Sequence, residues 1–141
     1  MDSLTFFWNK DIYAKNKTSK LFIRAMKENI AFHRLHCPKY KKILDMQGFN
    51  ESLLHNEASL ALIPPLPTLY FKRNRLFSLP YKKLRIKATS SGTGGIKSKL
   101  GFDDKSFYYG MQMVCRFFSY HKLISLKPSY CIILGFEPSA K

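Results

Sequence analysis

Two runs of alternating apolar and polar residues, separated by a glycine-rich loop, constrain the fold of this chain more than any other feature of its sequence. The first run reads KLRIKA over residues 83–88, and the second reads KSKLGF over residues 97–102. Alternation with a period of two is typical of half-exposed β-strands. We therefore expect a strand, a glycine loop and a second strand. The residues expected to share a side are Leu84, Ile86 and Ala88 in the first strand and Ser98, Leu100 and Phe102 in the second.

The residues after this loop predict a helix and then a buried strand. Asp103 or Asp104 can cap the helix, which runs to about Lys122, and Gly110 lowers its stability but can permit close packing. The apolar run YCIILGF follows over residues 130–136 and has the length of a buried strand. Together with the strand before the helix, these elements predict a βαβ unit with a right-handed crossover. The apolar stripe expected along the helix consists of Phe107, Met111, Val114 and Phe118.

The residues before the first strand predict two helices and a connector. The first helix spans residues 18–35, is capped by Thr18 or Ser19, and ends before Pro38 because the residue preceding a proline disfavours helix. The second spans residues 38–46, with the proline in its first turn and a glycine after its end. The apolar stripe of the first helix consists of Phe22, Met26, Ile30 and His33.

Four prolines between residues 64 and 80 exclude a regular helix across that whole stretch. We therefore expect an extended connector over residues 61–80. Helices, connector, strand–loop–strand and βαβ unit together predict a fold of the α/β class.

Size, charge and cysteine usage narrow the class of protein. The chain has 141 residues, which is one domain at most, and a net charge of +15. Such a charge indicates an anionic partner, or else a balancing acidic remainder of a longer protein. The amino terminus lacks the pattern of a signal peptide, and no apolar stretch is long enough to span a bilayer. We expect a cytoplasmic protein with three free packing cysteines, Cys37, Cys115 and Cys131.

The loop between the two strands has the composition of a phosphate-binding site. Its glycines let several backbone N–H groups point into one concavity, and Lys97 and Lys99 offer charge to a polyphosphate. The hydroxyl donors are Ser90, Ser91, Thr93 and Ser98. The Walker pattern fails because Ile96 stands where a glycine is needed, and the dinucleotide pattern fails because Lys97 takes the place of its third glycine. A plain glycine hairpin stays open as the alternative.

The stretch TSSGTGGIKS, residues 89–98, resembles the phosphate loop of the adenylate-forming enzymes, which reads Ser-Ser-Gly-Thr-Thr-Gly-x-Pro-Lys. Its Gly-x-Lys-Ser ending is similar to the acyl-protein synthetase branch, known from the fatty-acid reductase system of bacterial luminescence and distantly related to phenylacetate–coenzyme A ligases. HRLHCPKYKKIL (residues 33–44) and IPPLPTLYFK (residues 63–72) resemble the helix junction and the proline-rich approach of that branch. The loop positions that match are Ser90, Ser91, Gly92, Thr93 and Gly95, while Gly94 and Lys97-Ser98 depart from the usual pattern.

This resemblance implies a ligase that activates a carboxylic acid, in that branch a fatty acid, with ATP. The acid attacks the α-phosphate, acyl-AMP and pyrophosphate form, and the acyl group then moves to a thiol. The loop would bind the β- and γ-phosphates, with Mg²⁺ sharing their charge. The implied ATP phosphate-binding residues are Ser90, Ser91, Gly92, Thr93, Gly94, Gly95, Lys97 and Ser98. No catalytic residue and no protein-bound metal site is assigned.

The resemblance also implies that this chain is the amino-terminal portion of a longer enzyme and inactive alone, because the family's adenine pocket and acceptor cysteine have no match here. Residues 1–82 would be a helical region with its connector, and residues 83–141 the start of the α/β nucleotide-binding subdomain, together one incomplete domain. A carboxylic acid would be the substrate, and a complementing chain or an acyl reductase the protein partner.

Three rival interpretations remain. His33, His36 and Cys37 could ligate zinc, although their spacing matches no standard site. Basic and aromatic residues interleave over residues 69–87, as in proteins that bind single-stranded nucleic acid, but a solvated strand face has the same composition. The chain could also be a catalytically silent partner subunit that keeps the fold without the chemistry.

Overall fold

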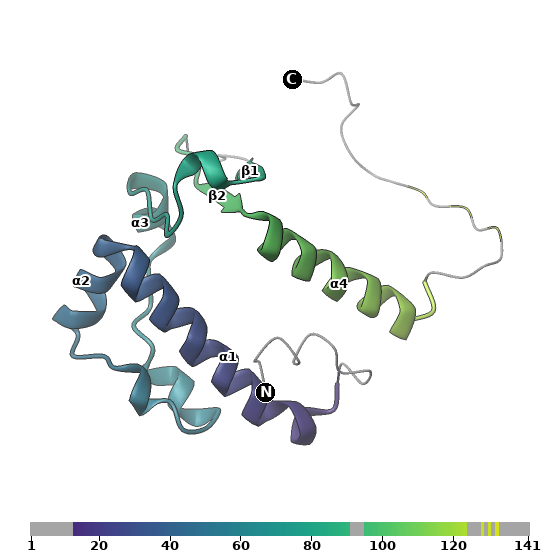
Figure 1. Cartoon of the computed structure of the whole chain (residues 1–141), viewed down its shortest axis with the longest axis horizontal. Coiled ribbons are helices and arrows are strands. Elements are labelled where there is room, and N and C mark those ends of the chain that lie inside the picture. The colour runs from purple at the N-terminus through teal and green to yellow at the C-terminus, as the bar shows by residue number, and fades with distance from the viewer. Residues whose placement is uncertain (1–12, 91–94, 124–127, 129, 131, 133–141) are drawn as a thin grey trace.

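The computed structural model describes residues 13–90, 95–123, 128, 130 and 132. Its helices and strands follow in the order α1 (Lys15–His36), α2 (Pro38–Met46), α3 (Thr68–Arg73), β1 (Ile86–Thr89), β2 (Lys99–Phe102) and α4 (Asp104–Tyr120), as Figure 1 shows. The 3₁₀ turns η2 (Glu51–Leu53), η3 (Ala58–Leu62) and η4 (Tyr81–Lys83) lie between them. The described part of the chain is thus helical with a small two-stranded sheet, which is compatible with the expected α/β class.

Helix α1 begins earlier than predicted and without the predicted cap. Its first residue follows Ala14, whose carbonyl accepts hydrogen bonds from the backbone N–H and the hydroxyl of Thr18. The Ser19 hydroxyl donates instead to the Glu57 carboxylate, far along the chain. Both candidate cap residues therefore lie inside the helix, and the predicted cap was wrong. The predicted end is confirmed, because Cys37 is extended and separates α1 from Pro38.

Helix α2 has the predicted bounds, with Pro38 in its first turn. The chain leaves it through Gly48, whose φ of 61° is in the left-handed region that glycine tolerates best. The backbone N–H of Phe49 then donates to the carbonyl of Leu44 at 3.0 Å. This turn directs the Phe49 ring back against α1 and α2, where it is buried.

The core lies between α1, α2 and the turn after them. Its buried members are Ile23, Ile30, Leu44, Phe49 and Leu54, and the half-buried residues packed on it are Phe22, Met26, Tyr40, Leu60 and Ile63. The predicted stripe of α1 is thus largely confirmed, with Ile23 as an additional member. Each fully buried aliphatic side chain contributes about 1.5–3 kcal/mol to stability relative to exposure.

Arg34 of α1 ties the same three segments together at their polar edge. One guanidinium nitrogen lies 2.9 Å from the Glu51 carboxylate in η2, and the other contacts Asp45 in α2. These hydrogen bonds, that to Asp45 first, raise the pKa of Arg34. A planar guanidinium can hold two carboxylates at fixed angles, which orients η2 against the helices.

The proline-rich connector is not extended throughout, and that expectation was wrong. The 3₁₀ turn η3 opens it, and helix α3 begins directly after Pro67. A proline disrupts a helix that would continue through it, but it is well tolerated next to a helix start. No proline lies between Thr68 and Arg73, so this short helix is allowed.

Strands β1 and β2 form an antiparallel hairpin, which confirms the predicted strand–loop–strand arrangement. Ile86 is paired with Phe102 and Thr89 with Lys99. The turn η4 replaces the start of the predicted first strand, and the strand begins only at Ile86. On the second strand, Leu100 and Phe102 share a side as predicted, and both are exposed, at 52% and 41%.

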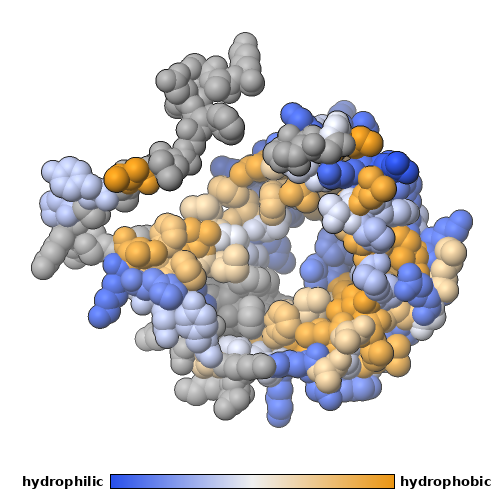
Figure 2. Space-filling view, turned by 180° about the vertical axis from the view of Figure 1, so that it is seen from behind, coloured by the Kyte–Doolittle hydropathy of each residue, from blue (hydrophilic) through white to orange (hydrophobic). Residues whose placement is uncertain are grey.

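Helix α4 begins at the predicted cap. The Asp103 carboxylate accepts from the Ser106 backbone N–H at 2.8 Å, and the Ser106 hydroxyl accepts from the Asp103 N–H at 3.0 Å. The predicted apolar stripe is half exposed, and apolar side chains follow α4 along the surface in Figure 2. A Cβ added at Gly110 would meet nothing within 4 Å, so the close packing predicted there is not found among the described residues.

The βαβ unit stays a prediction. Of its last strand, residues 130–136, the structure describes Tyr130 and Ile132, which are exposed and belong to no strand, and the other residues lie outside the described part. Cys131 is among the latter. Of the predicted packing cysteines, Cys37 is buried as expected, whereas Cys115 is exposed and that prediction was wrong.

Candidate functional site: the glycine loop of the hairpin

The hairpin is closed at the base of its loop by two hydrogen bonds. The Ser90 backbone N–H donates to the Ser98 carbonyl at 3.1 Å, and the Ser98 N–H donates to the Ser90 hydroxyl oxygen at 2.9 Å. Ser90 and Ser98 are therefore held next to each other. Because the Ser90 oxygen is used as an acceptor, its O–H proton is still available to donate to a bound anion.

Half of the predicted phosphate-binding residues lie in the described part of the chain. They are Ser90, Gly95, Lys97 and Ser98, whereas residues 91–94, which are Ser91, Gly92, Thr93 and Gly94, lie outside it. The two serines are half-buried, and Gly95 and Lys97 are exposed. The described part of the loop is thus open to solvent, as a loop that receives a ligand must be.

The backbone conformation at position 95 favours glycine. Its φ is 82°, which side chains rarely adopt, while a Cβ built there would meet nothing within 4 Å. A positive φ next to ordinary residues turns successive N–H groups towards one side, as in anion-binding nests. The described geometry therefore fits one requirement of a phosphate loop.

The charges around the hairpin are not all available to a ligand. Arg85 lies 2.7 Å from the Asp104 carboxylate and 5.5 Å from the Phe107 ring centroid, so its charge is already compensated. Lys87 lies over the Tyr81 ring at 4.3 Å from its centroid. Lys97 and Lys99 make no ion pair with the described residues. These two lysines are therefore available to pair with a bound polyphosphate.

The histidines near the junction of α1 and α2 are not arranged as a metal site. His33 Nδ1 is hydrogen-bonded to the Ser78 hydroxyl at 2.6 Å, and His36 Nδ1 to the Phe32 carbonyl at 2.8 Å. Within the described ranges, no three His, Cys, Asp or Glu side chains are grouped so that they could hold a metal ion. The contact between His33 and Ser78 was missed in the sequence, because nothing in a pattern links residues so far apart.

Among the helices of the described part of the chain, none combines the length and the apolar character that crossing a membrane requires.

Comparison with known proteins identifies the family. A family model described as "Acyl-protein synthetase, LuxE" matches residues 1–138, which is nearly the whole chain. Searches of curated proteins and of solved structures gave no significant match. The match includes the glycine loop, the Cys37-Pro38 junction and the proline-rich approach on which the resemblance was based. The chain therefore belongs to the LuxE family of acyl-protein synthetases.

Proposed function

We propose that this chain takes part in the ATP-dependent activation of a fatty acid as an acyl-adenylate, followed by transfer of the acyl group to a thiol. Membership of the LuxE family supports acyl-protein synthetase activity in general. The observation that carries the more specific proposal is the hairpin loop. Its described residues 95–97 are exposed, and it is closed by Ser90 and Ser98. It contains Gly95 at positive φ and leaves the charge of Lys97 without an ion pair among the described residues.

In the proposed reaction a carboxylate oxygen attacks the α-phosphorus of ATP, the bond from that phosphorus to the bridging oxygen breaks, and pyrophosphate leaves. A carboxylate is already deprotonated at neutral pH, so no general base is needed. The loop N–H groups, the Ser90 hydroxyl and Lys97 would stabilise charge on the departing phosphates. Bound Mg²⁺ would supply additional neutralisation of that charge.

Phosphate binding can be tested directly by ³¹P NMR titration of ATP and of pyrophosphate with the whole chain. We expect the β- and γ-phosphorus signals to shift on binding, and Lys97→Ala to weaken binding at least several-fold. Gly95→Val should weaken it too, because valine disfavours a φ of 82°. Lys20→Ala removes an exposed lysine of α1 and is the charge-matched control. If both loop variants bind like the wild type, the loop is not the phosphate site.

We further propose that this chain supplies the phosphate loop while other residues supply the acyl acceptor. Cys37 is 3% exposed, and buried thiols are poorly reactive, whereas Cys115 of α4 is exposed and is the described thiol that could compete as acceptor. The resemblance implies that the adenine pocket has no match in this chain, so fatty-acid-dependent exchange between pyrophosphate and ATP should require a complementing chain. The acyl group should then appear on that chain. Labelled acyl groups found on Cys37 or Cys115 in the chain alone would contradict this arrangement.

Nucleic-acid binding is the main alternative, since the net charge of +15 would favour it. The structure gives it less support in the segment that suggested it. Lys87 lies over one face of the Tyr81 ring and Phe77 lies beside it, so a base could stack only on the face that Lys87 leaves open. Salt-dependent binding of random oligonucleotides that ATP does not displace would favour this alternative.

A further inference from the structure

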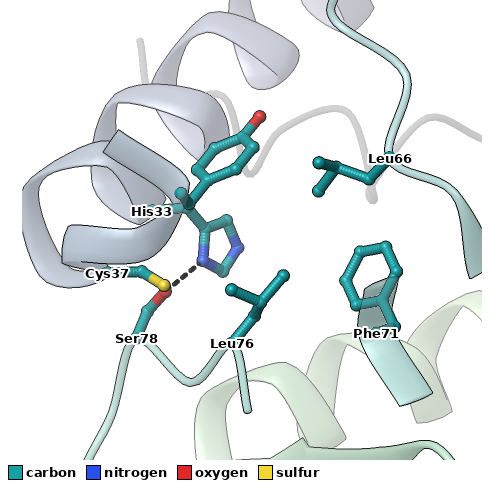
Figure 3. A pocket seen from close by; sticks show the side chains of 7 residues that line it. His33, Cys37, Leu66, Phe71, Leu76 and Ser78 are labelled. Carbon is teal, nitrogen blue, oxygen red and sulfur yellow. Dashed lines mark hydrogen bonds between the residues drawn. The ribbon is translucent and has the colours of Figure 1, made fainter. Parts of the chain in front are cut away.

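A second site lies away from the glycine loop, where the junction of α1 and α2 faces the connector (Figure 3). It is a half-open cavity of about 250 Å³. The residues that line it are His33, Cys37, Tyr40, Leu66, Phe71, Leu76 and Ser78. The lining is mostly apolar, and its polar groups come mainly from the helix junction and from Ser78. Such a combination of apolar walls and a few polar groups is typical of small-molecule sites.

The imidazole of His33 is the polar group best placed to contact a ligand. Its Nδ1 is held by the Ser78 hydroxyl at 2.6 Å, which fixes the ring. Figure 3 shows the other ring nitrogen, Nε2, turned towards the space between Leu66, Leu76 and Phe71. No contact within the described residues satisfies that nitrogen. The cavity is half-open, so this nitrogen is not sealed from solvent and can exchange a hydrogen bond with water for one with a molecule that enters the cavity.

The environment of the His33 ring favours its neutral form. Burial lowers the pKa of His33, and the neighbouring His36 lowers it further. In a neutral imidazole one nitrogen donates and the other accepts, and the Ser78 hydroxyl can serve either arrangement. Nε2 can therefore donate to an oxygen or accept from a hydroxyl. A partner with both abilities would fit either tautomer.

We propose that this cavity binds a small apolar molecule that carries one terminal oxygen group, a hydroxyl or a carboxyl, with its carbon body against Leu66, Phe71 and Leu76 and its oxygen on His33 Nε2. The apolar walls account for the body, and His33 Nε2, which has no hydrogen bond to the described residues and faces the cavity, accounts for the oxygen. The site shares no residue with the glycine loop, so it is independent of the proposed phosphate binding.

The size of the cavity limits the ligand. An engineered apolar cavity of roughly 150 Å³ binds benzene, so a cavity of this volume accommodates a ring with a short substituent. Benzyl alcohol, benzoate and toluene are suitable probes, because they share one carbon skeleton and differ in the terminal group. Ligands of this size bind with Kd values on the order of millimolar.

The test is a titration of the whole ¹⁵N-labelled chain with each probe, followed by NMR. We expect benzyl alcohol to shift the resonances of the cavity residues and of His33 Nε2, and to bind several-fold more tightly than toluene. Comparing benzoate with benzyl alcohol tells whether the natural oxygen group is a carboxyl or a hydroxyl. Equal binding of toluene and benzyl alcohol would overturn the proposal, as would no binding at tens of millimolar, well above about 1 mM.

Variants separate the role of the nitrogen from that of the cavity. His33→Phe keeps an apolar ring and should abolish the preference for benzyl alcohol over toluene. Ser78→Ala leaves His33 in place but frees its ring, and should weaken benzyl alcohol binding several-fold. His55→Gln, at an exposed histidine that does not line the cavity, is the matched control and should change neither. If His33→Phe is folded by its NMR spectrum and keeps the preference, the proposal is wrong.

Discussion

Helices α1 and α4 both have an apolar face, and they differ in what covers it. The face of α1 packs on α2 and on the turn that follows, which buries Ile23 and Ile30. The face of α4 packs on little within the described residues, and Met111 and Val114 on it are 46% and 40% exposed. Figure 2 shows apolar side chains along the surface of α4, with an opening between α4 and the α1–α2 side.

The difference shows how each helix is stabilised. The partners of α1 lie within the next few dozen residues of the chain, so local packing is enough to form its core. Helix α4 depends more on its cap, on the hairpin before it and on contacts at its far end. There Tyr13 is hydrogen-bonded to His121 at 2.9 Å and lies edge-on to Tyr120. Substitutions in the two regions should therefore have different costs.

The largest expected effect is on the core of α1 and α2. Leu44 is 0% exposed, so Leu44→Ala leaves a cavity and should lower the free energy of unfolding by about 2–5 kcal/mol. Leu100→Ala, at a leucine that is 52% exposed on β2, should cost less than about 1 kcal/mol. Urea denaturation of both variants measures the difference. Equal costs would mean that Leu100 is buried in solution and that the contrast between the regions is wrong.

Two glycines, one in β2 and one in α4, sharpen the comparison within the hairpin and the helix that follows it. A Cβ at Gly101 of β2 would lie 2.5 Å from the Leu84 side chain, so Gly101→Ala should destabilise the hairpin by about 1–3 kcal/mol. Gly110 of α4 has open space around it, and Gly110→Ala should stabilise the helix by about 0.5–1 kcal/mol. Thermal unfolding of the two variants should shift in opposite directions. A destabilised Gly110→Ala would reveal a neighbour packed against α4.

Local signals in the sequence were sufficient where one short segment decides the structure. The bounds of α2, the hairpin and the cap at Asp103 follow from proline, from alternation and from a capping residue, each of which acts on its immediate neighbours. The start of α1 was misjudged because Ser19 bonds to a distant carboxylate, and α3 because the prolines were treated as one block.

Contacts between distant segments could not be predicted in the same way. The composition of the loop predicted a phosphate site, and phosphate binding stays a prediction. The structure adds the hydrogen bonds between Ser90 and Ser98 that close the loop. The pair of His33 and Ser78 depends on how the connector crosses the helix junction. Leu66 and Leu76 of the connector line the same cavity, but they have no periodic pattern from which this path could be predicted.

Removal of the cap of α4 should have an intermediate effect. Asp103→Ala leaves the Ser106 N–H without its acceptor and should cost about 1 kcal/mol, whereas Asp103→Asn keeps an acceptor and should cost little. Hydrogen bonds from Ser106 lower the pKa of Asp103 below its usual 3.8. The contribution of the Asp103 carboxylate to stability is therefore fully present above pH 3.8, and it is lost as the pH falls through the lowered pKa of the folded chain. Urea titrations at neutral and acidic pH would show it, and equal losses in both variants would contradict the capping role.

The smallest expected effect comes from His33, at the edge of the well-packed region. Its pKa lies below the usual 6.5 in the folded chain, because burial and His36 disfavour its charged form. The unfolded chain therefore binds a proton more readily than the folded chain. As a result, the free energy of unfolding is highest above the unfolded-state pKa of 6.5 and decreases as the pH falls from there towards the lowered pKa of the folded chain. The urea midpoint of the wild type should therefore fall more between about pH 7.5 and about pH 5 than that of His33→Gln. His55→Gln, at an exposed histidine, should retain the wild-type slope. If the wild type and His33→Gln respond to pH alike, the imidazole is solvated and the junction is looser than the core beside it.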